Sequence, residues 1–366
     1  PITSPPRVNR RRALTTVWAV EAITRSVSFS RRAACRLPDF SSTRFLSSTP
    51  ALDFAVSILI CGSIAYDSIM VFPGRFADQI LPHQVHILNV AFLVPELRRE
   101  FGGCAGNIAY NVKLLGGQAW PMATVGEDSQ PYLDRLERLQ ISQRFVRRVE
   151  GSFTAQAFIT TDADNNQITA FHPGAMSNSH LNQIPNDGSI KLGIVAPDGR
   201  DGMLQHAAQF AEHGVPFVFD PGQGLPMFSG DELRWFVDRA SYVAVNDYEA
   251  KMLSDRTQLT LGELSRKVRA LVVTHGAAGS QIHLNGKVIQ IPVAPASNPI
   301  DPTGCGDAYR AGLLVGIAQE MDWETTGRLA ATMGSIKIEH SGGQNHTADQ
   351  TSIAERFNQA FGYRPW

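Results

Sequence analysis

From residue 56 onward the chain alternates short apolar runs with helical segments, and this alternation limits the fold more than any other feature of the sequence. The runs are apolar throughout and have strand length, as in strands that are buried on both faces of a parallel sheet. The predicted strands are 56–62, 119–125, 192–196, 215–220, 242–245 and 270–274, and the predicted helices are 106–115, 130–139, 203–213, 231–240 and 247–253. The pattern therefore predicts one α/β domain, a three-layer αβα sandwich around a mostly parallel, doubly wound sheet.

One region breaks this alternation and predicts a second, smaller sheet. Residues 153–161 and 168–172 suit two strands, and the polar segment 162–167 between them suits a turn. Residues 66–76 could pair with this hairpin. We expect the segments near 66–98 and 153–176 to form a small β lid over one end of the main sheet.

The first 52 residues differ in composition from the rest of the chain. They hold nine Arg, no Lys and two acidic residues, so that 24 basic and 32 acidic residues remain in 53–366. An Arg- and Ser-rich, acid-poor start is typical of an organellar, for instance mitochondrial, transit peptide. The alternative is an artefact, because a chain that starts at Pro1 rather than Met can be a fragment or an overextended gene model. In both cases we expect residues 1–52 to be a disordered extension.

Charge, cysteine content and hydropathy exclude several classes of protein. A mildly acidic body argues against nucleic acid as the main partner. The four cysteines show no C-x-x-C spacing, which favours a reduced intracellular protein. No stretch reaches the roughly 18–20 apolar residues of a membrane span. We expect a cytoplasmic protein without a membrane partner, or an organellar one if residues 1–52 are a genuine targeting segment.

The strongest chemical signal is the segment 300–312, I-D-P-T-G-C-G-D-A-Y-R-A-G. Gly304, Cys305 and Gly306 have little side chain to obstruct a phosphate, and the N-terminus of the helix predicted after them favours an anion. Asp307 stands beside that site, where a carboxylate would repel a resting phosphate but could take a proton from an attacking hydroxyl. The alternative is a helix-capping Asp after a glycine turn. The chain contains no G-x-x-x-x-G-K-[ST] segment, so it is not a P-loop enzyme.

Two segments together resemble the signatures of the ribokinase-like (PfkB) family of small-molecule kinases. Residues 301–307, D-P-T-G-C-G-D, resemble the C-terminal signature, and residues 101–109, F-G-G-C-A-G-N-I-A, the N-terminal one. Their order and separation match too, and the resemblance covers about residues 57–366. It implies the ribokinase-like fold, a kinase domain over 53–366, and ATP with Mg²⁺. It also gives the role of catalytic base to Asp307 and that of anion hole to the three residues before it.

Further matches imply the substrate site. Asp67, in the segment G-S-I-A-Y-D after the first strand, resembles the Asp that holds two adjacent sugar hydroxyls in this family. Two carboxylate oxygens can accept hydrogen bonds from both hydroxyls of a cis-diol. Gly103 and Asn107 resemble the residues that let the sugar approach and bond its hydroxyls. The structural alternatives are a turn-capping Asp and a closely packed glycine pair.

The nucleotide side is implied by two further segments. Asn246 and Glu249 resemble the family's N-x-x-E motif, in which the Glu organises Mg²⁺ with its waters and the Asn contacts the nucleotide. One indirect carboxylate suffices for an ion that keeps most of its water. An ordinary helix start is the alternative. Residues 273–279 resemble the strand and turn that hold ATP, and the residues expected to face it are Thr274, Gly276 and Gly279.

The loop before the anion hole carries one more implied site. Asp301 and Thr303 match positions that bind a monovalent cation in many relatives. The resemblance therefore implies K⁺ as a further cofactor.

Within the family the chain is most similar to bacterial nucleoside kinases that resemble adenosine kinase. In those enzymes an aromatic residue of the lid stacks on the base, and a Gln after a D-P strand end contacts the nucleoside. Phe171 and Gln223 occupy these places. Stacking on a base contributes about 1–3 kcal/mol and tolerates different bases. We expect ATP-dependent phosphorylation of the 5′-hydroxyl of a purine ribonucleoside such as adenosine or inosine, as in purine salvage.

Three alternatives stay open. One is a PfkB sugar kinase that acts on ribose or fructose, and another is a nucleoside-binding regulator without catalysis. The third, a dinucleotide-dependent oxidoreductase, lacks the G-x-G-x-x-G loop after the first strand, since Gly62 is followed by Ser-Ile-Ala-Tyr. The expected partner is a small molecule, and the expected assembly is a monomer or a homodimer through the lid.

Overall fold

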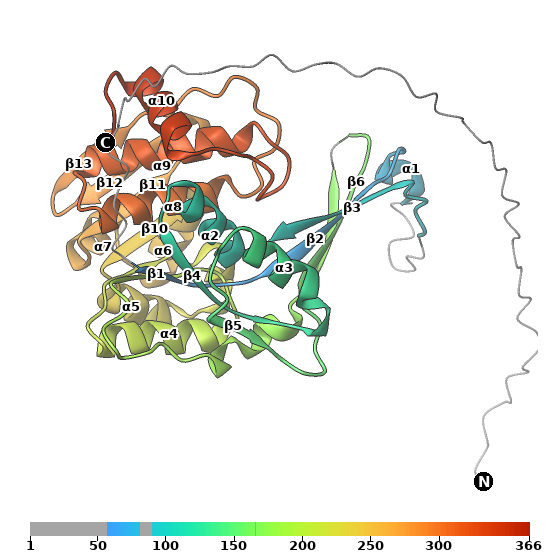
Figure 1. Cartoon of the computed structure of the whole chain (residues 1–366), viewed down its shortest axis with the longest axis horizontal. Coiled ribbons are helices and arrows are strands. Elements are labelled where there is room, and N and C mark those ends of the chain that lie inside the picture. Colours follow the sequence, from blue (N-terminus) through green and yellow to red (C-terminus); the bar gives the residue numbers. More distant parts are fainter. Residues whose placement is uncertain (1–56, 81–89, 165) are drawn as a thin grey trace, which may run out of the picture. The chain divides into compact units, whose positions relative to one another are not determined.

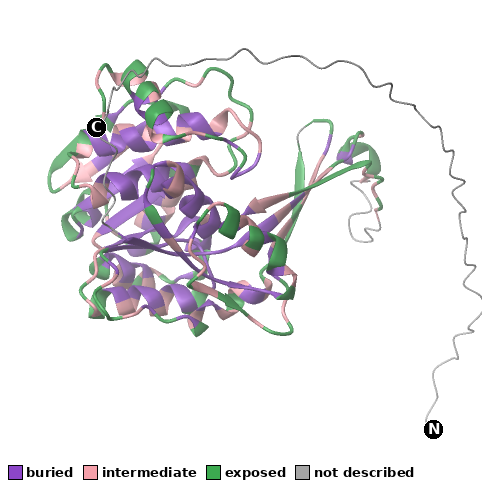
Figure 2. Ribbon diagram, viewed as in Figure 1, coloured by how far each residue is buried: buried purple, intermediate pink, exposed green. Residues whose placement is uncertain are grey.

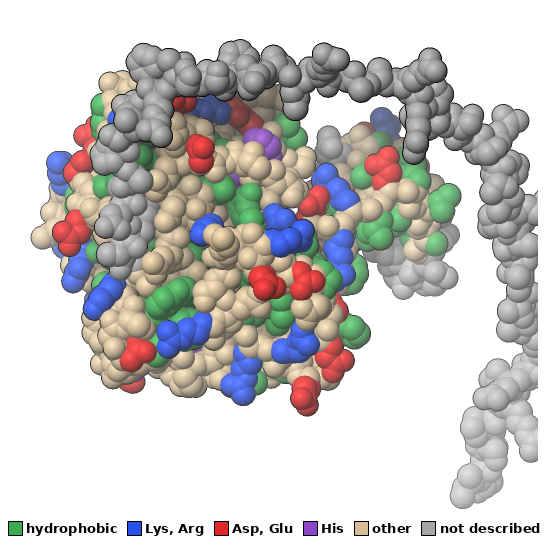
Figure 3. Space-filling model, viewed as in Figure 1, with side chains coloured by type: hydrophobic (Ala, Val, Ile, Leu, Met, Phe, Trp, Pro, Cys, Tyr) green, Lys and Arg blue, Asp and Glu red, His purple; other side chains and the backbone are tan. Residues whose placement is uncertain are grey.

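The computed structural model of this chain describes residues 57–80, 90–164 and 166–366. The predicted extension 1–52 and part of the predicted lid segment 66–98 lie outside these residues. Within the described ranges, no helix is both long and apolar enough to cross a membrane. On the face that Figure 3 shows, the acidic and basic side chains of these residues are interspersed rather than gathered by sign.

A large sheet of nine strands forms the centre of the described residues, in the order β13-β12-β11-β10-β9-β8-β1-β4-β5 (Figure 1). The strands from β11 to β5 run parallel, and β12 and β13 extend one edge as an antiparallel hairpin. Their bounds are β1 Ser57–Cys61, β4 Gln118–Val125, β5 Phe145–Arg148, β8 Leu192–Val195, β9 Phe217–Phe219, β10 Tyr242–Asn246, β11 Ala270–Thr274, β12 Ser280–Leu284 and β13 Lys287–Ile291.

Helices cover both faces of this sheet, as the alternation in the sequence predicts (Figure 2). Their bounds are α1 Phe76–Gln79, α2 Cys104–Leu114, α3 Gln130–Arg138, α4 Arg200–Glu212, α5 Gly230–Arg239, α6 Asp247–Thr257, α7 Leu261–Lys267, α8 Cys305–Ala318, α9 Trp323–Ile338 and α10 Gln350–Phe361. Short 3₁₀ turns lie at η2 Glu127–Ser129, η3 Gly174–Leu181, η4 Gly222–Met227 and η5 Gly276–Ala278. The predicted three-layer sandwich is confirmed.

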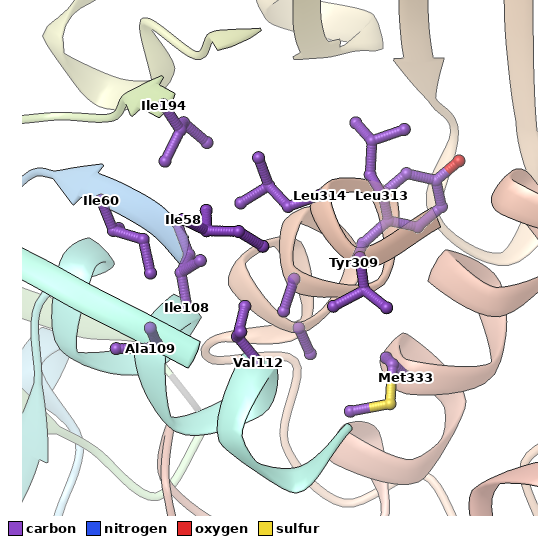
Figure 4. Close-up of a cluster of buried hydrophobic side chains, with 14 of the residues drawn as sticks. Ile58, Ile60, Ile108, Ala109, Val112, Ile194, Tyr309, Leu313, Leu314 and Met333 are labelled. Carbon is purple, nitrogen blue, oxygen red and sulfur yellow. The ribbon is translucent and has the colours of Figure 1, made fainter. Parts of the chain in front are cut away.

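The strands of the parallel part of the sheet contribute to two cores, because successive side chains point to opposite faces of the sheet. Ile58 and Ile60 of β1 pack with α2, α8 and α9 on one face, and Figure 4 shows them in one cluster with Ile108 and Leu314. Leu59 and Cys61 of the same strand pack with α4 and α5 on the other face. Continuous apolar strands such as β1 are therefore the expected sequence of a sheet that is covered on both sides.

A second sheet has four strands within the described residues, in the order β3-β2-β6-β7. Its bounds are β2 Ala65–Val71, β3 Glu96–Gly102, β6 Ala155–Thr161 and β7 Gln167–His172. The hairpin β6–β7 and the pairing of β2 with β6 agree with the expected lid. The structure adds β3, an edge strand that the sequence analysis did not predict.

Candidate active site

The loop 301–304 leads into α8 through a glycine that the backbone requires. Gly304 is the N-cap residue of α8 and has a φ of 77°, in the left-handed region that favours glycine. A Cβ placed on Gly306 would meet no atom within 4 Å, so the backbone is open there. The backbone N–H of Cys305 donates to the carbonyl of Pro302 at 3.1 Å, whereas those of Gly306 and Asp307 find no acceptor among the described residues. The first turn of α8 thus offers two free N–H groups at its positive end.

Asp307 lies in this first turn and meets Asn107 from the other predicted signature. Asn107 Nδ2 donates to Asp307 Oδ2 at 2.8 Å, across 200 residues of sequence. Burial raises the pKa of Asp307 to about 7; the Asn107 amide opposes this rise and the nearby Asp220 carboxylate adds to it. A carboxyl group with a pKa near neutrality suits a general base at physiological pH.

A chain of side chains behind Asn107 determines which way its amide points. Gln344 Nε2 donates to Asn107 Oδ1 at 3.1 Å and to the Tyr132 hydroxyl at 2.7 Å, and Gln344 Oε1 accepts from Arg135 Nε at 3.2 Å. Arg can only donate, so the Gln344 amide has one possible orientation, and Asn107 must then turn its NH₂ group toward Asp307. Gln344 was not predicted from the sequence, where its only local signal is the glycine pair that precedes it.

The carboxylate of Asp67 on β2 has no hydrogen-bond partner among the described residues, although its side chain is half-buried. Burial raises its pKa to about 6, and the carboxylates of Glu100 and Asp301 add to the rise. A Cβ on Gly102 would lie 2.5 Å from Asp67 Oδ2, so this glycine leaves room for the carboxylate. A half-buried carboxyl group without a protein partner suits a ligand that brings hydrogen-bond donors.

The register of the lid strands places Phe171 and Asp67 on one face. Glu100, Asp67, Ala157 and Phe171 are successive partners across β3, β2, β6 and β7, so their side chains point to the same side of the lid. With strands about 4.8 Å apart, Phe171 lies roughly 10 Å from Asp67. Phe171 is 52% exposed, and the small side chain of Ala157 stands between the two. We call this row the lid row.

Gln223 lies in η4 and reaches the start of α2. Its Nε2 lies 3.8 Å from the sulfur of Cys104, the first residue of α2, which also contacts Asp307. Burial raises the pKa of the Cys104 thiol, which keeps it protonated. The structure thus brings Gln223 to the side of Asp307, with a thiol between them that sequence analysis had not singled out.

A buried ion pair stands beside Asp307. Arg310, one turn further along α8, donates through Nε and a terminal nitrogen to both oxygens of Asp220, each at 3.1 Å. The two side chains are only 6% and 7% exposed. Asp220 follows β9 directly, so the pair ties that strand end to α8. Neither residue was predicted to have a role.

The predicted nucleotide residues lie at neighbouring strand ends. Asn246 and Thr274 end β10 and β11 and are direct partners in the sheet. Asn246 and Glu249 form a capping box at the start of α6, with both backbone-to-side-chain bonds at 2.8 Å. The alternative, an ordinary helix start, therefore also holds for these two residues. It occupies only one carboxylate oxygen of Glu249, so the other is available to a ligand. Burial, with Asp220 nearby, raises the pKa of Glu249.

These strand ends and the start of α8 form one neighbourhood at the carboxyl edge of the sheet. Thr274 pairs with Ser280 of β12, whose hydroxyl is hydrogen-bonded to that of Tyr309 on α8 at 2.7 Å. The part of the chain that the structure describes holds no group of three or more His, Cys, Asp or Glu side chains that could bind a metal. The lone carboxylate of Glu249 suits Mg²⁺, which takes most of its ligands from phosphate and water.

A model of the pfkB family carbohydrate kinases matches residues 63–350. The chain belongs to this family. It is 32% identical over 273 residues to a nucleoside kinase of Methanocaldococcus jannaschii, a match that covers 74% of this chain and 90% of that one. The predicted family and kinase activity are confirmed.

Two solved structures of the Burkholderia thailandensis nucleoside kinase are similar to this pfkB kinase. The complex with inosine has a TM-score of 0.77 and 54% identity, and covers 84% of this chain and 99% of that one. The complex with ADP-inosine has a TM-score of 0.75 and 56% identity, with coverage of 84% and 97%. The ribokinase-like fold is therefore confirmed by comparison as well as by topology.

Two glycines that were expected to face ligands in this kinase are needed for packing. A Cβ on Gly103 would lie 2.6 Å from the backbone nitrogen of Ala65, and one on Gly279 would lie 2.3 Å from the carbonyl of Ile291. Gly276, by contrast, has open space where a Cβ would stand. Close packing explains the first two glycines without a ligand, and the ligand contacts of all three stay predictions.

The carboxylate of Asp301 bonds to backbone in this kinase. Its Oδ1 accepts from the N–H of Thr303 and its Oδ2 from the N–H of Gly342, both at 2.8 Å. Burial raises its pKa, but these hydrogen bonds outweigh burial and leave the pKa below its ordinary value. The charged side chain of Asp301 therefore links the loop 301–304 to the segment 341–345 through hydrogen bonds.

Proposed function

We propose that this pfkB kinase transfers the γ-phosphoryl group of ATP to the 5′-hydroxyl of a ribonucleoside, with inosine and other purine nucleosides as substrates. The lid row carries this proposal, because one face of the lid holds a partnerless carboxylate at Asp67 and an exposed aromatic ring at Phe171, with little side chain at Ala157 between them. That spacing suits a ribose at one end and a base at the other. The inosine complexes of the B. thailandensis relative support the same assignment.

Asp67 accepts hydrogen bonds from the two ring hydroxyls of the ribose in this mechanism. A carboxylate that receives two O–H donors is stabilised in its charged form, which offsets the raised pKa of the free group. Phe171 stacks on the base, and Gln223 contacts the nucleoside near the start of α2. The lid then covers the sugar and excludes water, which would otherwise compete with the 5′-hydroxyl for the phosphoryl group.

Asp307 takes the proton of the 5′-hydroxyl as that oxygen attacks the γ-phosphorus and the bond to ADP breaks. Asn107, oriented by Gln344, holds the carboxylate in place. The free N–H groups of Gly306 and Asp307 donate to the transferring group, where fixed dipoles supply much of the acceleration. Positioning by the α8 start is therefore the main contribution of the protein.

Glu249 would hold Mg²⁺ through water, and the ion, when bound, neutralises charge on the phosphates. Asn246, Thr274 and Gly276 lie at the strand ends and turn where ATP would bind. ADP in the complex with the B. thailandensis relative supports ATP as the donor.

The deciding experiment measures ATP turnover by the full chain with Mg²⁺ against inosine, adenosine, guanosine, cytidine, ribose and fructose. We expect turnover with the purine nucleosides and far less with the free sugars. Turnover with ribose or fructose alone would replace this proposal by that of a sugar kinase and remove the roles given to Phe171 and Gln223. If none of the six acceptors leads to consumption of ATP, both the nucleoside kinase and the sugar kinase proposals are contradicted.

The assembly is proposed from the opposite face of the lid. Leu97, Phe158 and Ile168 alternate with the lid row and are 68%, 42% and 44% exposed. Several exposed apolar side chains on one face favour a protein contact. Sedimentation velocity would separate a homodimer through this face from a monomer, and Phe158→Asp would dissociate such a dimer.

A further inference from the structure

Lys337 is a fully buried lysine in the last turn of α9. Its ammonium donates to the backbone carbonyl of Asp301 at 2.9 Å and to that of His340 at 2.8 Å. No carboxylate forms an ion pair with it among the described residues; the Asp301 carboxylate bonds instead to backbone N–H groups. A buried charge is costly unless it is well paired, so a lysine held only by neutral carbonyls calls for an explanation.

The position of Lys337 suggests what this charge does. The Asp301 carbonyl belongs to the loop that enters α8, and the backbone N–H of Asp301 donates to the carbonyl of Ile338 at 3.1 Å. The last turn of α9 therefore holds the loop through both its N–H and its C=O. The positive charge of Lys337 also acts on the thiol of Cys305, the first residue of α8. The ammonium thus lies behind the loop proposed to bind the transferring phosphoryl group.

The oxygen atoms of Asp301 are poorly placed to bind the monovalent cation that the resemblance implies at Asp301 and Thr303. Such an ion binds carbonyl and carboxylate oxygens. Here the Asp301 carbonyl accepts from Lys337, and its two carboxylate oxygens accept from the backbone N–H groups of Thr303 and Gly342. Each of these oxygens has one protein donor in contact, so a cation would have to compete with three N–H groups. A second positive charge beside the ammonium would also be repelled.

We propose that the Lys337 ammonium takes the place of a monovalent cation behind the anion loop, so that this kinase turns over without K⁺. An ammonium group and a potassium ion carry the same charge, and both bind carbonyl oxygens. The lysine differs in that it is permanently attached to α9. The inference rests on the proposed phosphoryl transfer for its activity test, and on cation binding for a second, independent test.

The activity test compares turnover of inosine with tetramethylammonium chloride against KCl at equal ionic strength. We expect the unaltered chain to turn over equally in both. Lys337→Ala leaves a hole that a small cation can enter, so we expect turnover on the order of 10–10² lower without K⁺ and restored by K⁺ or NH₄⁺. Lys337→Met fills the hole without a charge and should be slow in all salts. Lys287→Ala, at an exposed lysine of β13, is the matched control.

The second test measures thermal melting in the same salts. K⁺ should raise the melting temperature of Lys337→Ala and leave that of the unaltered chain unchanged. A requirement of the unaltered chain for K⁺ would overturn the inference, as would a Lys337→Ala variant that is fully active in tetramethylammonium. If Lys337→Ala does not fold, the salt dependence of the unaltered chain decides alone. If no acceptor is turned over, the proposed function is contradicted. The melting test does not depend on turnover, so it would still show whether Lys337 takes the place of the cation.

Discussion

At the scale of single residues, the site is determined by what surrounds Asp307. Its carboxylate meets one amide, one buried ion pair and the start of a helix, and burial among these groups raises its pKa to about 7. Asp307 and Asn107 were singled out because each lies in a short segment that resembles a family signature. Gln344 could not be predicted, since it acts through contacts with Asn107, which lies 237 positions away. Lys337 could not be predicted either, because a single lysine in a helix has no local sequence pattern that indicates its contacts.

Asp307→Asn should lower turnover by roughly 10²–10⁴, because the amide cannot accept the hydroxyl proton. Inosine should still bind, since Asp67 and Phe171 are untouched. Steady-state kinetics and calorimetric titration measure the two effects separately. Asp201→Asn, at an exposed residue of α4, is the control, and unchanged turnover in Asp307→Asn would remove the base from the mechanism.

Phe171→Ala should weaken inosine binding by about 5–150-fold, which corresponds to the loss of about 1–3 kcal/mol of stacking. The matched control is Thr160→Ala, because Thr160 lies on the neighbouring strand, points to the opposite face of the lid and is not one of the residues named for the dimer contact. Equal losses in the two variants would indicate a general effect on the lid rather than stacking on a base. Titration of each variant with inosine provides the comparison.

At the scale of elements, burial decided what could be predicted. Strands buried on both faces, such as β1, have a continuous apolar sequence that is hard to mistake. The edge strand β3 has the sequence Glu-Leu-Arg-Arg-Glu-Phe-Gly, in which Phe101 is the one residue that strongly favours strands, so pairing with β2 decides its conformation. The hairpin β12–β13 has an Asn-Gly turn, a signal for a hairpin that sequence analysis overlooked.

The ion pair between α8 and the end of β9 should contribute strongly to stability. Arg310→Met leaves Asp220 buried without a partner and should lower the free energy of unfolding by about 3–5 kcal/mol. The double variant with Asp220→Leu should recover part of this loss, because it removes both charges. Denaturant titration measures each value. Lys251→Ala, which breaks an exposed pair, is the control, and an equally small loss in Arg310→Met would contradict the prediction.

At the scale of the whole molecule, the buried carboxyl groups predict how stability depends on pH. Burial raises the pKa of Asp198 to about 8 and that of Asp307 to about 7. Above pH 6.5 the folded chain therefore binds protons that the unfolded chain has already released. The free energy of unfolding should fall as the pH rises from 6.5 to 8, by about 1 kcal/mol per pH unit for Asp198 and about half of that for Asp307, which has released most of its proton above pH 7.

Denaturant titrations across this pH range check the direction. The buried histidines His206 and His346, whose pKa values are lowered to about 4 and about 3, oppose this fall near pH 6.5, where the unfolded chain still protonates about half of each. Their effect fades above pH 7, so the slope between pH 7 and 8 is the direct check of the direction. Asp198→Asn should flatten the dependence, whereas Asp201→Asn should not. A free energy of unfolding that rises with pH in this range would contradict the assignment.

The order of the lid strands also affects how such an enzyme folds and how its choice of acceptor can change. β2 pairs in parallel with β6, and β4, α3 and β5 of the main sandwich lie between them in the chain. The lid therefore has no contiguous sequence of its own, and its central pairing must wait until that half of the sandwich has brought the two strands together. Such a lid cannot be exchanged between proteins as a module. A change of acceptor must instead come from single substitutions along the lid row, made while the sandwich that assembles it stays intact.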